Sequence, residues 1–139
     1  MPTVDNCKLI DIKTITDRGK LGVIEFYDLP FIPKRVFYIY DVNDLEVRGN
    51  HAHYRTQQFL ICLQGECGVG LFDGNDTQEV HLDNPEQGLF IPEMIWDSQL
   101  YSKDAVLVVL ASTHYNPDDY ITDYEEFKRI ANATKQQFR

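Results

Sequence analysis

Long apolar runs are absent from this sequence of 139 residues. A membrane-spanning helix needs roughly 18 consecutive apolar residues. The longest apolar run, Ala105–Ala111, has only the length of a strand. The N-terminus has neither a basic segment nor an apolar stretch, so we expect no signal peptide. The sequence therefore predicts a protein without a membrane partner.

Positive charge is also scarce, with 13 lysines and arginines against 22 acidic residues and a net charge of −9. Nonspecific binding to nucleic acid requires a cationic surface that displaces counterions from the phosphates. The sequence contains no basic block, so we expect no nucleic-acid partner. A few arginines inside a pocket are still sufficient to bind a small anionic ligand.

Cysteine and phosphate-binding glycine patterns are sparse as well. The cysteines are Cys7, Cys62 and Cys67, and no two of them form a C-x-x-C pair. An odd number of unpaired cysteines without a secretory signal predicts reduced thiols in the cytoplasm. The glycines at 65–70 follow an expected strand, but no helix start comes after them, which excludes a phosphate-binding loop of the usual kind.

Short apolar runs separated by turn signals every 8–12 residues or so dominate the chain, and this spacing predicts an all-β sandwich or barrel. No linker or repeat divides the chain, so we expect one domain, residues 1–139. The expected strands are Lys8–Ile12, Leu21–Glu25, Arg35–Tyr40, His51–His53, Gln58–Leu63, Gly68–Phe72, Thr77–Leu82, Gly88–Ile91, Ile95–Leu100 and Val106–Ala111.

The C-terminal part has a helical pattern instead. Asn116 is a capping residue, and it is followed by a proline and two acids, as at many helix starts. After it, apolar residues recur at a spacing that fits one face of a helix. These residues are Tyr120, Ile121, Tyr124, Phe127 and Ile130. We therefore expect a short helix that begins near Asn116 and closes the β-structure.

Two histidines are the most informative residues. His51 and His53 lie two residues apart on an expected strand, so their side chains project from the same face. If that face lines a barrel, two imidazoles with a pKa near neutrality enter one cavity. The alternative interpretation is that both are surface or packing histidines.

The spacing around this pair is similar to the first cupin motif, because Gln58 follows His53 after four residues and Gly65 follows after six more. The segment from Gly88 to Asp97 is similar to the second motif. Metal-binding cupins have Glu where this chain has Gln58 and His where it has Asp97. A neutral amide is a weak ligand. A site of His51, His53 and Asp97 stays open as an alternative, but we expect neither a metal nor another cofactor.

Four further segments sharpen the resemblance, together with residues 115–121. They are Thr16–Leu21, Ile32–Tyr40, Arg48–His53 and Val108–Ser112. The ordered set resembles the sugar-nucleotide 3,4-ketoisomerases, WxcM-like cupins that act on dTDP-4-keto-6-deoxyglucose. The resemblance implies a jelly-roll (double-stranded β-helix) barrel and metal-independent isomerisation with the two histidines as acid and base. It also implies a homodimer that exchanges N-terminal strands, here Lys8–Ile12.

The reaction itself needs residues of these types. A ketone at C4 of a hexose acidifies the C3 proton, and its removal gives an enediol shared by C3 and C4. Return of a proton to C4 then leaves the ketone at C3. We expect His51 and His53 to carry these protons, and Tyr38 to donate to the enediolate or to relay a proton. Packing within a sheet is the alternative role for Tyr38.

The remaining candidates are substrate-binding residues. Arg35 and Arg48 have forked guanidinium groups that suit a diphosphate, and surface ion pairs are their alternative. Trp96 is able to stack on the sugar or the base, unless it is a core residue. We also expect Gln58 and Asp97, at the two altered motif positions, to contact the substrate.

Two other functions stay open. One is a 3,5-epimerase acting on the same kind of 4-keto sugar, since those cupins also carry an Arg-Gly-x-His stretch. The other is a metal-dependent cupin or a sugar-binding module without activity. The second histidine, His53, and the short chain favour the ketoisomerase.

Overall fold

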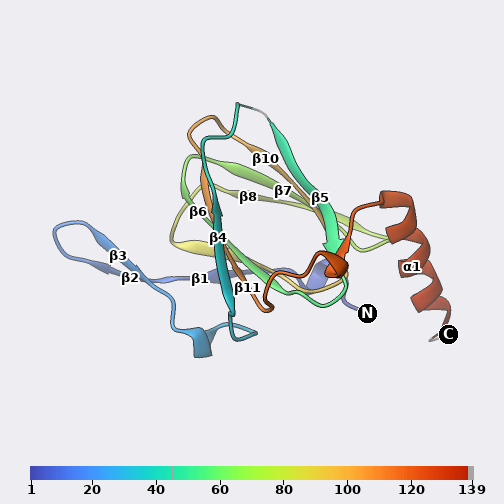
Figure 1. Ribbon diagram of the computed structural model, residues 1–139. Helices are drawn as coiled ribbons and strands as arrows, with labels where there is room; N and C mark the ends of the chain where they lie inside the picture. The colour runs from blue at the N-terminus through green and yellow to red at the C-terminus, as the bar shows by residue number, and fades with distance from the viewer. Residues whose placement is uncertain (45, 138–139) are drawn as a thin grey trace.

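The fold consists mostly of antiparallel strands, as Figure 1 shows for the computed structural model, which describes residues 1–44 and 46–137. One five-stranded sheet has the order β1-β9-β6-β11-β4, and a second has the order β12-β5-β10-β7-β8. β2 and β3 form a separate hairpin. No ladder in the described residues joins the two large sheets, so the jelly-roll is not closed into one barrel. The prediction of an all-β cupin fold with a C-terminal helix is confirmed.

The strands lie close to their expected positions. Their bounds are β1 Lys8–Asp11, β2 Lys13–Thr16, β3 Lys20–Val23, β4 Arg35–Ile39, β5 Val47–His53, β6 Gln58–Gln64, β7 Cys67–Phe72, β8 Thr77–Leu82, β9 Gln87–Ile91, β10 Trp96–Tyr101, β11 Val106–Ala111 and β12 Tyr120–Ile121. Three short 3-10 turns lie at Val4–Asn6, Phe26–Asp28 and Pro117–Asp119, and the helix α1 is Tyr124–Gln137. β2 and β12 were not expected from the sequence.

The main core lies between the two large sheets. Leu60 of β6 and Leu107 of β11 project into it from one sheet, and Val69 and Leu71 of β7 project from the other. Side chains alternate between the two faces of a strand, so the intervening residues of β6 point away from this core. Phe59 of β6 is nevertheless buried, because Ile12, Phe31 and other residues before β4 cover the outer face of the first sheet.

The C-terminal segment differs from its prediction. Asn116 caps only a single 3-10 turn, with its Oδ1 accepting a hydrogen bond from the Asp118 backbone N–H at 3.0 Å. Tyr120 and Ile121 then pair with β5 instead of continuing as a helix. α1 begins at Tyr124, and the Asp123 carboxylate accepts a hydrogen bond from the Glu126 N–H at 3.1 Å. Pairing with a strand edge outweighed the local helical pattern here.

The N-terminal strand and the cysteines complete the description. β1, expected as an exchanged strand, pairs with β9 of its own chain. The β2–β3 hairpin projects away from the sheets (Figure 1). All three cysteines are free, as predicted, and the structure also buries all of them; burial raises the pKa of Cys7 and Cys67 to about 12. In residues 1–44 and 46–137 no helix is long and apolar enough to cross a membrane.

Candidate active site

A bulge in β5 shapes the site. β10 pairs Asp97 with His51 but Ser98 with Gly49, so Asn50 is an extra residue in the ladder. Gly49 and Asn50 have φ angles of 82° and 57°, in the left-handed region. An inserted residue reverses the alternation of a strand. As a result Arg48 and His51, which are three residues apart, both line the same hollow.

The hollow has a volume of about 630 Å³ and lies between the inner faces of β4 and β5. Four of the predicted residues line it: Tyr38, Arg48, His51 and Gln58. Four other polar residues line it as well: Gln99, Tyr115, Tyr120 and Thr122. The sequence did not single these out, although the segment 115–121 belongs to the resemblance. A space of this size suits a small organic ligand.

The two histidines are neighbours, as their spacing predicts. Their ring centroids are 5.0 Å apart, with the rings nearly perpendicular. His51 lines the hollow, whereas His53 is only 4 % exposed and its Nε2 has no hydrogen-bond partner. Burial, with a smaller contribution from His51, lowers the pKa of His53 to about 4. His53 is therefore neutral at physiological pH and able to accept or pass a proton.

Asp97 lies next to His51 across the sheet and is fully buried. Its carboxylate accepts hydrogen bonds from Gln99 Nε2 at 2.6 Å and from Gln58 Nε2 at 3.4 Å. The Tyr101 hydroxyl donates in turn to Gln99 Oε1 at 2.7 Å. Burial raises the pKa of Asp97 to about 6, against the opposing effect of His51. Asp97 and Gln58 thus form a buried polar network behind the histidines.

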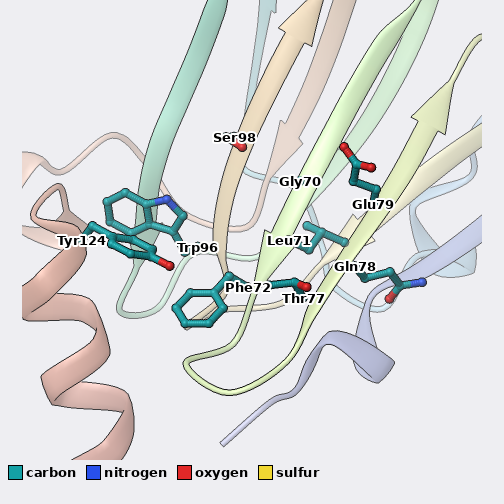
Figure 2. A pocket seen from close by; sticks show the side chains of 9 residues that line it. All are labelled: Gly70, Leu71, Phe72, Thr77, Gln78, Glu79, Trp96, Ser98 and Tyr124. Atoms are coloured by element: carbon teal, nitrogen blue, oxygen red, sulfur yellow. The ribbon is translucent and has the colours of Figure 1, made fainter.

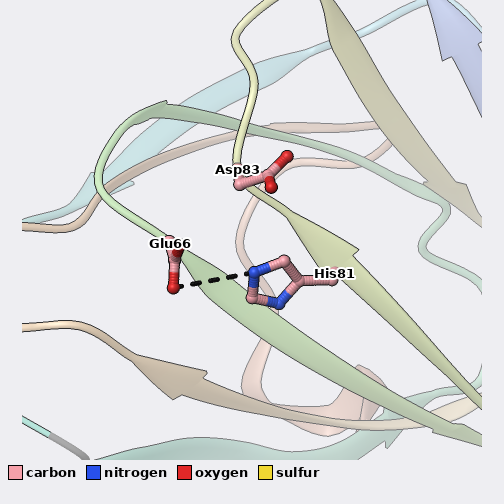
Figure 3. A group of neighbouring side chains, drawn as sticks. All are labelled: Glu66, His81 and Asp83. Atoms are coloured by element: carbon pink, nitrogen blue, oxygen red, sulfur yellow. Dashed lines mark ion pairs between the residues drawn. The ribbon is translucent and has the colours of Figure 1, made fainter.

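Metal ligation by His51, His53 and Asp97 requires their ligand atoms to come together. Among the described residues, only Glu66, His81 and Asp83 bring three such atoms within 4.8 Å of one another. Figure 3 shows this group, which is exposed and lies away from the hollow, with His81 Nε2 3.7 Å from Glu66 Oε2. An exposed ion pair of this kind contributes about 1 kcal/mol at most. The histidine pair and Asp97 do not form such a group in the described residues.

The arginines are available to an anion. Within the part of the chain that the structure describes, neither Arg35 nor Arg48 makes an ion pair with a carboxylate. The Arg35 guanidinium lies 5.3 Å from the Phe37 ring centroid and 5.6 Å from that of Tyr115, and its Nε is buried without a partner. Arg48 lies directly on the wall of the hollow.

The two predicted aromatic residues have different positions. Tyr38 lines the hollow but is 64 % exposed, and its ring stacks on Tyr40. It therefore lies at the rim. Trp96 does not line this hollow, because strand alternation places it on the outer face of its sheet. There it packs against Tyr124 and Phe127 of α1, next to a second, smaller hollow of about 490 Å³ (Figure 2). These contacts fit the alternative interpretation of Trp96 as a core residue, and its stacking on a substrate stays an untested prediction.

Comparisons with known proteins give the family. The model of the family described as WxcM-like, C-terminal (FdtA) matches residues 5–132. A TDP-4-oxo-6-deoxy-alpha-D-glucose-3,4-oxoisomerase from Aneurinibacillus thermoaerophilus is 46 % identical over 125 residues. That match covers 88 % of this chain and 90 % of the relative.

Solved structures agree with this match. A 3,4-ketoisomerase from Helicobacter canadensis is 39 % identical with a TM-score of 0.88, covering 91 % of this chain and 98 % of that one. A sugar 3,4-ketoisomerase from Thermoanaerobacterium thermosaccharolyticum, in complex with TDP, is 36 % identical with a TM-score of 0.89, covering 93 % and 96 %.

Epimerases are more distant. An epimerase from Mycobacterium tuberculosis is 17 % identical with a TM-score of 0.74, covering 84 % of this chain and 68 % of that one. This likeness extends to the fold alone. With residues 5–132 matched by the family model and 46 % identity to a relative named as a 3,4-oxoisomerase, the chain belongs to the WxcM-like (FdtA) family.

Proposed function

We propose that this chain is a TDP-sugar 3,4-ketoisomerase that moves the keto group of TDP-4-keto-6-deoxyglucose from C4 to C3. The observation that carries the proposal is the histidine pair, with rings 5.0 Å apart and one ring open to a hollow that Arg48 also lines. Membership of a family whose relatives bear this activity in their names supports it.

The reaction needs two balanced pairs of proton transfers, one pair at carbon and one pair at oxygen. One proton leaves C3 and another returns to C4, while the C3 hydroxyl loses its proton and the C4 oxygen gains one. No redox partner is required, because the electron pair of the broken C3–H bond forms the enediol double bond. Each positioned acid or base contributes about 10²–10⁴-fold to such a step.

We assign the proton transfer to the histidines. His51 contacts the sugar, because its ring lines the hollow, and His53 exchanges protons with it from the buried side. Tyr38, at the rim, is the proposed hydroxyl donor to the enediolate. Arg48 and Arg35 bind the diphosphate through the guanidinium groups that no carboxylate occupies in the described residues.

Gln58 and the buried Asp97 are joined by a hydrogen bond at the edge of this site. Gln58 lines the hollow and donates its amide hydrogen to Asp97, so it is able to contact the sugar with its carbonyl oxygen. Asp97 is completely covered, so we propose that it acts on the substrate through Gln58 and His51. The site as proposed needs no metal or other cofactor.

The test is an NMR analysis of the product formed from TDP-4-keto-6-deoxyglucose in D₂O. We expect a ketone at C3 and deuterium at C4. Deuterium at C5 with the ketone still at C4 would show an epimerase instead. Protein treated with a chelator and dialysed should keep its turnover, and loss that added metal restores would indicate a metal-dependent cupin.

The variant His51→Asn tests the assignment of the histidines. We expect kcat to fall by about 10²–10⁴-fold, because a positioned acid–base group is removed while the strand is kept. His81→Asn is the matched control, since His81 is exposed on the outside of the second sheet and should leave turnover unchanged. Full turnover by a folded His51→Asn protein contradicts the assignment.

We also propose a cytoplasmic homodimer formed by residues 1–139 as one cupin domain. The three free thiols support a reducing compartment. The projecting hairpin supports a second copy, because its apolar residues Ile15 and Leu21 are exposed. In a strand-exchanged form the partner's β1 would take the place of β1 on β9.

A further inference from the structure

We propose that Tyr120 is a positioning residue that holds the two histidines of the ketoisomerase site in their mutual arrangement. This inference rests on the proposed function of that site. The Tyr120 ring centroid lies 4.5 Å from that of His53 and 5.2 Å from that of His51. It therefore contacts both imidazoles, which no other aromatic ring in the described residues does.

The backbone of Tyr120 is held in register with the histidines. β12 pairs with β5, with Tyr120 opposite His53 and Ile121 opposite Ala52. Ile121 is buried with Ala52 and Phe127 in the cluster between the second sheet and α1. Since neighbouring residues of a strand point to opposite faces, burying Ile121 on the outer side turns Tyr120 toward the histidines.

Asp119 anchors the segment from the other side. Its carboxylate is buried and accepts hydrogen bonds from the Arg55 N–H at 2.9 Å, from the Thr56 N–H at 3.1 Å and from the Thr56 hydroxyl. Its backbone carbonyl accepts a further bond from the Tyr54 N–H at 2.9 Å. The residue before Tyr120 is thus attached to the loop that follows β5, so the ring and the histidines share one rigid support.

The ring has two effects on the histidines. It occupies the space into which either imidazole would otherwise rotate, and a misplacement of 1 Å in a catalytic group costs about 10²-fold in rate. It also helps to keep water from His53. The groups that face His53 are His51 on β5, Asp119 before β12, Arg35 on β4 and the Tyr120 ring itself. Removal of the ring admits water and favours the protonated imidazole.

The experiment compares Tyr120→Phe with Tyr120→Leu. Phe keeps the ring and loses the hydroxyl, whereas Leu keeps apolar volume and loses the ring. We expect Phe to retain kcat within about threefold and Leu to lose about 10²-fold in kcat with KM little changed, because the arginines are untouched. The acid limb of the kcat profile should move to higher pH only in Tyr120→Leu.

A pH titration monitored by the NMR signals of the histidines measures the same effect in the absence of substrate. His53 should titrate near pH 4 in the wild type and in Tyr120→Phe, and closer to the unperturbed value of about 6.5 in Tyr120→Leu. This measurement separates the two proposals. If the wild type does not convert the keto sugar but the titration shifts as expected, the proposed function fails and the positioning role stands.

The anchor offers a matched pair of variants. Asp119→Asn replaces the buried acceptor, whereas Asp118→Asn changes its exposed neighbour. We expect the first to lower kcat in the same direction as Tyr120→Leu and the second to have no effect. Equal losses in Tyr120→Phe and Tyr120→Leu overturn the proposal, because the hydroxyl would then be the essential group. An unchanged His53 titration in a folded Tyr120→Leu protein overturns it as well.

Discussion

At the scale of single residues, two buried ionisable groups have opposite shifts in pKa. Burial lowers the pKa of His53 to about 4 and raises that of Asp97 to about 6. Between about pH 4 and pH 6.5 the unfolded chain binds more protons at His53 than the folded protein does, so this group makes the protein more stable as pH rises. Asp97 binds more protons in the folded state between about pH 4 and pH 6, so its effect has the opposite sign. The two effects largely cancel.

Asp97→Asn should reveal the contribution of His53. Once the carboxyl is removed, we expect the free energy of unfolding to increase by about 2 kcal/mol from pH 5 to pH 7, against less than about 1 kcal/mol for the wild type. Urea denaturation at both pH values measures the difference. The comparison uses the change with pH within each protein, so a general loss of stability in the variant does not affect it. An equally small change in the variant would contradict the opposed shifts.

At the scale of elements, the bulge in β5 decides which side chains meet in the hollow. A Cβ at Gly49 would lie 3.1 Å from the Asp97 carbonyl oxygen and 3.3 Å from Asp97 Oδ1, at a φ angle of 82°. Both the close approach and the left-handed backbone require glycine at this position. The bulge therefore couples the strand that carries the histidines to the buried carboxylate of β10.

Gly49→Ala should lower the free energy of unfolding by about 1–3 kcal/mol and reduce turnover, since the left-handed strain moves Arg48 and His51. Gly68→Ala on β7 is the matched control, because a Cβ there meets no atom within 4 Å and the backbone has no positive φ. We expect stability within about 0.5 kcal/mol of the wild type for this control. Thermal denaturation measures the stability of both variants, and an assay with the keto sugar measures their turnover. Equal effects of the two substitutions would exclude a special role for the bulge.

The helix α1 packs on the second sheet through the rings of Tyr124 and Phe127. Phe127 has no exposed surface and contacts Trp96 and Phe72. Removal of a buried phenylalanine ring costs about 3–5 kcal/mol. We therefore expect Phe127→Ala to lower the free energy of unfolding by about this amount in urea, while Glu125→Ala on the exposed side stays within about 0.5 kcal/mol. If Phe127→Ala lowers the free energy of unfolding no more than Glu125→Ala does, this packing role of Phe127 is wrong.

At the scale of the whole molecule, the projecting β2–β3 hairpin carries the prediction of a dimer. Leu21 in this hairpin is 59 % exposed. Leu63 on β6, outside the hairpin, is 52 % exposed and therefore offers a control of similar exposure. We expect light scattering after gel filtration to give the mass of a dimer for the wild type. Leu21→Asp should shift the protein toward monomer, because a charge in an apolar interface is costly, and Leu63→Asp should not. A monomeric wild type would contradict the homodimer.

Several features could be predicted because they depend on local spacing. The strands Thr77–Leu82 and Val106–Ala111 match their expected bounds, and His51 and His53 are neighbours because side chains two positions apart in a strand lie on one face. The Gly49 bulge was not predicted, because the expected strand began only at His51, whereas β5 begins at Val47. No signal in the sequence indicates the side of the sheet on which Trp96 lies, because alternation does not tell which face of a strand is the inner one.

By itself, the sequence determined the all-β class, the cupin motifs and the pairing of the histidines, because alternation, turn residues and spacing are properties of neighbouring positions. Only the tertiary structure decided that Tyr120 contacts both imidazoles, that Asp97 lies buried beside His51 and that Trp96 lies under α1. These contacts join segments far apart in the chain. They depend on how sheets and helix pack against one another, which no local pattern of residues contains.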